Sequence, residues 1–138
     1  MYTWPNGNNW TIGTTLLNTW VYFALVRTSG QTQLYVNGSA VGTAQADTTN
    51  VTGAVKKLFI GADGETSGDG FPGNITNFRW TNAAVYSTDY STPTSPLSAL
   101  PQTKLLLLGG SAANPVVDAT GINVLTNYNT TWSAATPF

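Results

Sequence analysis

The sequence predicts an all-β fold, an antiparallel β-sandwich of the jelly-roll type. Three observations support this prediction: hydrophobic residues recur with a period of two in several short runs, Gly and Asn turn signals separate the runs, and no window shows an amphipathic helix with caps. A chain of 138 residues has the size of one domain and is long enough to bury a core. We therefore expect a single sandwich domain over residues 1–138.

The first two predicted strands form a hairpin. Residues 20–28 (WVYFALVRT) carry large apolar side chains on both faces, which predicts a strand buried between two layers. Residues 31–37 (QTQLYVN) alternate instead, with Leu34 and Val36 on the face that we expect to be buried and polar residues on the other. The NG pair at 37–38 is favoured in a two-residue hairpin loop. These features predict a meander of antiparallel strands.

The rest of the chain predicts further strands and one extended segment. The predicted strands are 56–62, 73–81, 104–108 and, with a weaker alternation, 122–126. Within the second of them, Ile75 is out of phase with Phe78 and Trp80, which predicts a bulge or twist between them. Residues 87–103 contain three prolines, so we expect an extended surface segment rather than a central strand.

The composition excludes several classes of function. Cys and His are absent, which rules out disulfides, thiolate chemistry and His-dependent triads. Charged residues make up only 8% of the chain and the net charge is −1, so there is no basic stripe for nucleic acid. No apolar run approaches the roughly 18 residues of a membrane span. We expect neither a nucleic-acid partner nor membrane insertion.

An acidic, Gly-rich loop at residues 62–73 offers the one predicted metal site. Asp63, Glu65 and Asp69 supply the hard oxygen ligands that calcium prefers, although their spacing matches no EF-hand loop. The alternative is a solvated hairpin tip without a ligand. Calcium is the only cofactor that the sequence suggests.

Catalysis is not expected. Glycan-cleaving enzymes use two carboxylates about 5 to 9 Å apart. This chain has a single Glu, which lies in the Gly-rich loop, where a carboxylate without apolar packing rarely acquires a raised pKa. The prediction is a protein that is not an enzyme.

Sugar binding is the other chemistry that the side chains suggest. It needs an aromatic face against a pyranose ring, with polar groups that fix the hydroxyls. The predicted glycan-binding residues are Tyr35, Asn37, Phe71 and Tyr90. Tyr35 is the strongest of them because it shares the polar face of its strand, although a Tyr there can equally be a cross-strand packing partner.

The order of the motifs NTWVYFALVR, LYVNG, LFIGAD, FPGNITNFRWTNAAVYS and PTSPLSALPQTKLLLL resembles the laminin-G-like branch of the concanavalin A-like lectin/glucanase fold. The form that it resembles occurs in structural proteins of phages and large DNA viruses. The resemblance covers residues 18–138 and implies core positions at Trp20, Ala24, Leu34, Val36, Ile60, Ile75, Phe78 and Tyr86. Such domains begin with further strands, but only 19 residues stand before Trp20. We therefore expect residues 1–19 to be a divergent segment, with either a shortened N-terminal half or completion of the sandwich by another chain.

The resemblance implies a non-enzymatic structural or surface module of a virus particle, in a capsid, tail or fibre. The expected partners are other virion chains or further copies of this chain, and the expected location is the virion surface. The alternative is an autonomous carbohydrate-binding module that recognises host cell-surface glycans, with or without calcium.

Overall fold

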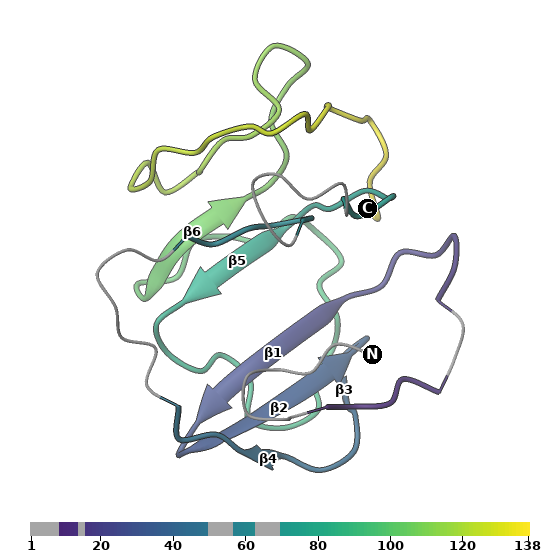
Figure 1. The fold of residues 1–138 in the computed structure, drawn as a ribbon, viewed down its shortest axis with the longest axis vertical. Helices are drawn as coiled ribbons and strands as arrows, with labels where there is room; N and C mark the ends of the chain where they lie inside the picture. The colour runs from purple at the N-terminus through teal and green to yellow at the C-terminus, as the bar shows by residue number, and fades with distance from the viewer. Residues whose placement is uncertain (1–8, 14–15, 50–56, 63–69) are drawn as a thin grey trace. The chain divides into compact units, whose positions relative to one another are not determined.

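The structure is a computed structural model that describes residues 9–13, 16–49, 57–62 and 70–138. The regular elements of these residues are six strands (Figure 1): β1 (Phe23–Thr28), β2 (Gln31–Val36), β3 (Ser39–Ala40), β4 (Gln45–Ala46), β5 (Phe78–Thr81) and β6 (Thr103–Leu107). All the strand pairs are antiparallel. The predicted all-β, antiparallel class is confirmed. In the same residues, no helix has the length and apolar character needed to cross a membrane.

The chain divides into two compact units, and each unit is built from two separate segments. The first unit comprises Met1–Thr52 and Ala83–Pro93, and the second comprises Gly53–Asn82 and Thr94–Phe138. The sheet of β1 to β4 belongs to the first unit, and the pair of β5 and β6 belongs to the second.

Two tight turns set the register of the first sheet. Ser29 and Gly30 join β1 to β2 with φ values of 51° and 71°, and the strands pair from Thr28↔Gln31 to Phe23↔Val36. The predicted Asn37–Gly38 turn joins β2 to β3, with φ values of 48° and 83°. Two residues with positive φ match the twist of a hairpin, so both turns fix the meander that the sequence predicts.

The burial of β1 differs from the prediction. A strand buried on both faces was expected over residues 20–28, but Val26, at 8% exposed, is the one buried residue of β1. Phe23 and Leu25, on the opposite face, are 53% and 47% exposed. Their pairing partners Val36 and Leu34 share that face, so one side of the hairpin is apolar and only partly covered.

The burial of β2 also differs. Tyr35, expected on the solvent-facing side, is only 4% exposed, whereas Leu34 and Val36 are half-buried. The reason is the segment Ala83–Pro93, which returns to the first unit and brings two aromatic rings onto the Tyr35 face. The alternation of polar and apolar residues along β2 could not reveal that the segment Ala83–Pro93 covers the Tyr35 face.

In the second unit, β5 is shorter than the strand predicted there, and β6 is shifted along the chain from its predicted position. Asn77 has a φ of 54°, which interrupts the extended chain, so of the predicted strand 73–81 only β5 forms. The irregularity expected in this run is confirmed there, and a further register shift lies between Trp80 and Thr81. β6 begins and ends one residue earlier than predicted.

Two predicted strands are wrong in the described residues. Residues 57–62 are not a strand, because Gly61 adopts a φ of 81° and its carbonyl accepts a hydrogen bond from Phe71 N at 2.7 Å in a loop. Residues 122–126 are not a strand either, because Asn123 is held by a buried carboxylate rather than by a neighbouring strand. The proline-containing run after Ser87 has no regular structure until β6, as expected.

Candidate ligand-binding site

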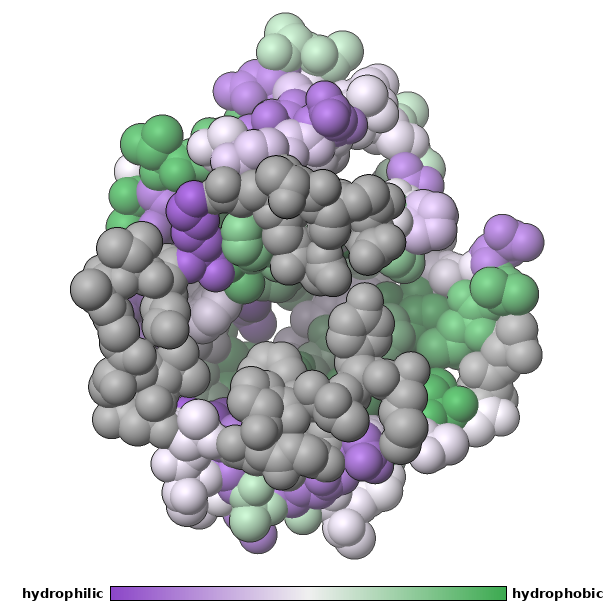
Figure 2. Space-filling model, in the orientation of Figure 1, coloured by the Kyte–Doolittle hydropathy of each residue, from purple (hydrophilic) through white to green (hydrophobic). Residues whose placement is uncertain are grey.

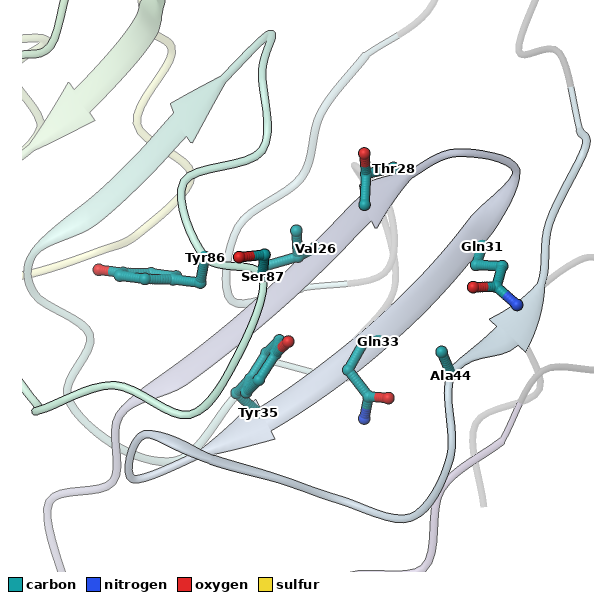
Figure 3. Close-up of a pocket in the computed structure, with 8 residues that line it drawn as sticks. All are labelled: Val26, Thr28, Gln31, Gln33, Tyr35, Ala44, Tyr86 and Ser87. Carbon is teal, nitrogen blue, oxygen red and sulfur yellow. The ribbon is translucent and has the colours of Figure 1, made fainter.

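A pocket of about 170 Å³ opens on one face of the β1–β2 hairpin, within the first unit (Figure 3). Alternation along β1 and β2 places side chains of both strands on this face, and the register sets Val26 opposite Gln33 and Thr28 opposite Gln31. Two other segments of the unit complete the lining. The lining residues are Val26, Thr28, Gln31, Gln33, Tyr35, Ala44, Tyr86 and Ser87.

The lining combines aromatic rings with neutral polar groups. The Gln33 side-chain nitrogen donates to the carbonyls of Leu34 at 2.8 Å and Val41 at 3.0 Å, which fixes its amide. The side chains of Thr28, Gln31 and Ser87 make no hydrogen bond within the described part of the chain. Their amide and hydroxyl groups are therefore available to a ligand.

A cluster of aromatic rings lies beside the pocket and includes two of its lining residues. We call it the tyrosine cluster: Tyr22, Tyr35, Tyr86 and Tyr90. Tyr90 is at its centre, stacked on Tyr86 with ring centroids 3.6 Å apart and packed against Tyr35 at 5.6 Å. The hydroxyls of Tyr22 and Tyr86 are 3.3 Å apart. Aromatic pairs of this kind add stabilisation beyond the area that they bury, so the cluster fixes the two pocket tyrosines.

Backbone contacts hold the segment Ala83–Pro93 against the hairpin. Tyr90 N donates to the Gly38 carbonyl at 2.9 Å, and the Asp89 carboxylate accepts a hydrogen bond from Ala40 N at 2.9 Å. The approach is so close that a Cβ on Gly38 would lie 2.0 Å from the Tyr90 carbonyl oxygen. Glycine at this position therefore permits both the positive φ of the turn and the approach of the segment.

The hydroxyl of Tyr90 is buried and has no hydrogen-bond partner among the described residues. Burial raises its pKa to about 12, and the neighbouring Tyr86 and Tyr35 add to the shift. An unpaired buried hydroxyl opposes folding, because it loses its hydrogen bonds to water without replacement.

Removing this hydroxyl tests its cost. We expect Tyr90→Phe to leave the free energy of unfolding unchanged or to raise it by about 1 kcal/mol, since no hydrogen bond is lost. The folded pKa of about 12 exceeds the ordinary value of 10.0, so the wild type should lose stability as pH rises above 10. Urea unfolding of both proteins at pH 7 and in alkaline buffer would measure these effects. Tyr86→Phe is the matched control, because it removes a hydroxyl that does contact another, that of Tyr22. If Tyr90→Phe lost more stability than Tyr86→Phe, the Tyr90 hydroxyl would not be unpaired in the folded protein.

The predicted glycan-binding residues do not all lie together. Tyr35 and Tyr90 meet in the tyrosine cluster, where the Tyr90 ring is stacked on Tyr86 and tilted against Tyr35. Tyr35 is only 4% exposed, so it is a packing partner within the cluster, and its ring also borders the pocket. Asn37 is exposed in the β2–β3 turn, where its side-chain oxygen accepts a hydrogen bond from Tyr22 N at 3.0 Å. Phe71 belongs to the second unit and is 58% exposed.

The predicted calcium ligands Asp63, Glu65 and Asp69 lie outside the described residues, so calcium binding stays a prediction. Within the described ranges, no group of three acidic, His or Cys side chains is placed to hold a metal ion.

Sequence reasoning missed the polar lining of the pocket and two buried carboxylates. Gln31 and Gln33 follow the same alternation as Tyr35, a signal that could have marked one continuous face. Asp47 was not singled out, yet its side chain accepts hydrogen bonds from the Thr32 hydroxyl at 2.8 Å and from Thr49 N at 3.1 Å. The Thr32 bond, aided by Thr49 and by Arg27 Nε at 3.4 Å, keeps the pKa of Asp47 below its usual range against the effect of burial.

Asp118 is the corresponding carboxylate of the second unit. It accepts hydrogen bonds from the backbone N–H groups of Leu106, Thr120 and Asn123 at 3.0 to 3.1 Å, and from the Thr120 hydroxyl at 2.7 Å. Burial alone would raise its pKa, but these hydrogen bonds outweigh burial and hold the pKa well below the usual range. Asp118 thereby joins the strand β6 to the loop that follows it.

Both carboxylates predict acid sensitivity. Because their folded pKa values lie below the ordinary 3.8, their contribution to stability is present above about pH 4 and is lost as pH falls further. We expect the melting temperature to fall steeply between pH 4 and about pH 2. Circular dichroism melts across this range would measure it, with Asp118→Asn as the comparison. An equally steep fall in that variant would mean that other groups cause the transition.

Comparison with known families agrees with this architecture. A family model described as the concanavalin A-like lectin/glucanases superfamily matches residues 2–89, a range that takes in β1 to β5 and also most of the N-terminal segment that the motif resemblance left out. No significant match was found among curated proteins or solved structures. The matched range, together with the antiparallel pairing of all the described strands, confirms both the resemblance and the predicted β-sandwich class. Because the model covers more than half of its length, the chain belongs to the concanavalin A-like lectin/glucanases superfamily.

Proposed function

We propose that the chain is a non-enzymatic carbohydrate-binding module and that the pocket on the β1–β2 hairpin is its glycan site. The observation that supports this proposal is the lining itself. Tyr35 and Tyr86 provide the aromatic boundary, while Thr28, Gln31 and Ser87 present neutral polar groups with no partner in the described residues. A concave site with aromatic walls and a few convergent polar groups is the usual form of a small-molecule site.

The same lining supports binding without catalysis. None of its eight residues is a carboxylate, and hydrolysis of a glycosidic bond depends on a pair of them. Asp47 and Asp118, the buried carboxylates of the described residues, are committed to several hydrogen bonds each and have lowered pKa values, the opposite of what a general acid needs.

Binding of the 138-residue chain to a glycan array, followed by calorimetry with the best ligand, tests the proposal. We expect Gln31→Ala and Ser87→Ala each to weaken binding by about tenfold, the effect of losing one or two hydrogen bonds. Ser39→Ala is the matched control, because Ser39 is exposed on β3 and does not line the pocket. Absence of glycan binding, or equal affinity of all three variants, would overturn the proposal.

A structural role in a virus particle, at its surface and in contact with other virion chains or further copies, is the second candidate. It is favoured by the edge of β1. In the described residues β1 pairs only with β2, and the backbone groups of alternate residues Phe23, Leu25 and Arg27 point away from that partner. An unpaired edge of six residues is a template for another strand.

Apolar side chains near this edge add to the case. Leu17 is 76% exposed and Trp20 is 38% exposed in the segment that leads into β1. Figure 2 shows hydrophobic surface on the side of the molecule where this segment runs in Figure 1. Light scattering after size exclusion tests assembly: a defined oligomer that Leu25→Lys dissociates supports it, and a monomer at all concentrations contradicts it.

A further inference from the structure

We infer that the pocket selects a single uncharged sugar residue, as a monosaccharide or a chain end, and rejects acidic sugars such as uronic and sialic acids. The inference rests on the proposed glycan-binding function and specifies its ligand. It follows from the size of the pocket, from the chemistry of its lining and from the position of the nearest cation in the same unit.

The size of the pocket suits a ligand of about one ring. Its volume is about 170 Å³, whereas sites that enclose drug-sized ligands usually measure about 300 to 1,000 Å³. The Tyr86–Ser87 segment and Ala44 border the hairpin face at different sides of the site (Figure 3). The terminal sugar of a glycan can enter such a site. An internal sugar is linked to a neighbour on each side, and both neighbours would have to cross the Tyr86–Ser87 and Ala44 borders.

The polar groups of the lining match neutral hydroxyls. Each sugar hydroxyl both donates and accepts hydrogen bonds, and so do the hydroxyls of Thr28 and Ser87 and the amide of Gln31. A carboxylate accepts only, and its burial without a cation or several N–H donors is costly. The eight lining residues carry no charge that could compensate it.

The first unit has one Lys or Arg in its sequence, Arg27, and it does not serve the pocket. Arg27 lies between the pocket residues Val26 and Thr28 in β1, so its side chain points to the face of the strand opposite the pocket. Its guanidinium is also engaged with Asp47, whose carboxylate lies 3.4 Å from Nε and whose carbonyl accepts hydrogen bonds at 3.2 and 3.3 Å. An acidic sugar in the pocket would therefore find no Lys or Arg partner within the first unit.

Matched pairs of neutral and acidic ligands test the inference on the full chain. The probes are the methyl glycosides of glucose, galactose and mannose, each against the corresponding methyl uronide, together with N-acetylneuraminic acid. Titration by calorimetry or ligand-observed NMR should show at least one neutral glycoside binding ten times more tightly than its uronide. The affinity should not change between low and high salt, because neither partner is charged in the site.

A charge variant gives the complementary result. Gln31→Lys should raise the affinity for the uronide at least tenfold, whereas Ser39→Lys, at an exposed position outside the pocket, should leave it unchanged. Equal affinity of the wild type for both members of a pair, or preference for internal chain residues over ends, would overturn the inference and leave glycan binding intact. Failure of every neutral and acidic probe to bind would instead overturn the proposed function itself.

Discussion

Gly38→Ala is expected to destabilise the first unit by about 3 kcal/mol or more. Two terms add: about 1 to 2 kcal/mol for an L residue in the left-handed region, and about 1 to 3 kcal/mol for overpacking. The overpacking is severe because the new Cβ would lie 2.0 Å from the Tyr90 carbonyl oxygen, a backbone atom that cannot rotate away. Urea unfolding followed by circular dichroism would measure the loss, and near-ultraviolet signals should report separation of the tyrosine cluster.

Gly30→Ala is the matched control for this prediction. Gly30 lies in the other hairpin turn of the same sheet, with a φ of 71°, but the nearest atom to its Cβ position is the Thr48 methyl at 3.8 Å. Gly30→Ala should therefore lose only about 1 to 2 kcal/mol, which is what an L residue costs in the left-handed region. Equal destabilisation of the two variants would mean that the approach of Tyr90 to Gly38 contributes nothing.

Asp118→Ala should have the second large effect, in the other unit. The substitution leaves the N–H groups of Leu106, Thr120 and Asn123 without their acceptor, and Leu106 is only 3% exposed. An orphaned buried donor costs about 1 to 3 kcal/mol, so we expect a loss of about 3 kcal/mol in total. Thermal unfolding would measure it, and hydrogen exchange should show faster exchange at the amide of Leu106.

Two comparisons make the Asp118 result interpretable. Asp89→Ala removes an exposed carboxylate that accepts one hydrogen bond, from Ala40 N, and should cost about 1 kcal/mol or less. Asp118→Asn keeps an oxygen acceptor and should lie between the two. If Asp118→Ala were no more harmful than Asp89→Ala, the hydrogen bonds of Asp118 would not support β6.

The hairpin could be predicted because its determinants are local. Ser29–Gly30 and Asn37–Gly38 specify both turns in two residues each, and they fix the register between β1 and β2. The burial of Tyr35 could not be predicted in the same way. Its face is covered by residues about fifty positions later in the chain, and a single strand's alternation does not say what will pack on it.

In the candidate site, too, features set by neighbouring residues could be predicted, and features set by residues remote in sequence could not. Gln31 and Gln33 suggested only a solvated face, since the Tyr86–Ser87 segment that turns this face into a pocket is remote in sequence. Asp118 carried a local signal that could have been used, because Asp followed by Thr and Gly within three residues is typical of a side chain that caps its own turn. The wrong strand at 122–126 follows from missing that turn.

The division of each unit into two segments has a consequence for synthesis of the protein on the ribosome. After residue 52, thirty residues that belong to the second unit are translated before the segment Ala83–Pro93 appears. The nascent β1–β2 hairpin must therefore wait, with the rings of Tyr22 and Tyr35 uncovered, until Tyr90 leaves the exit tunnel. Pausing or truncation in this interval would expose an aromatic surface to chaperones and proteases, so the timing of elongation is part of how this chain reaches its fold.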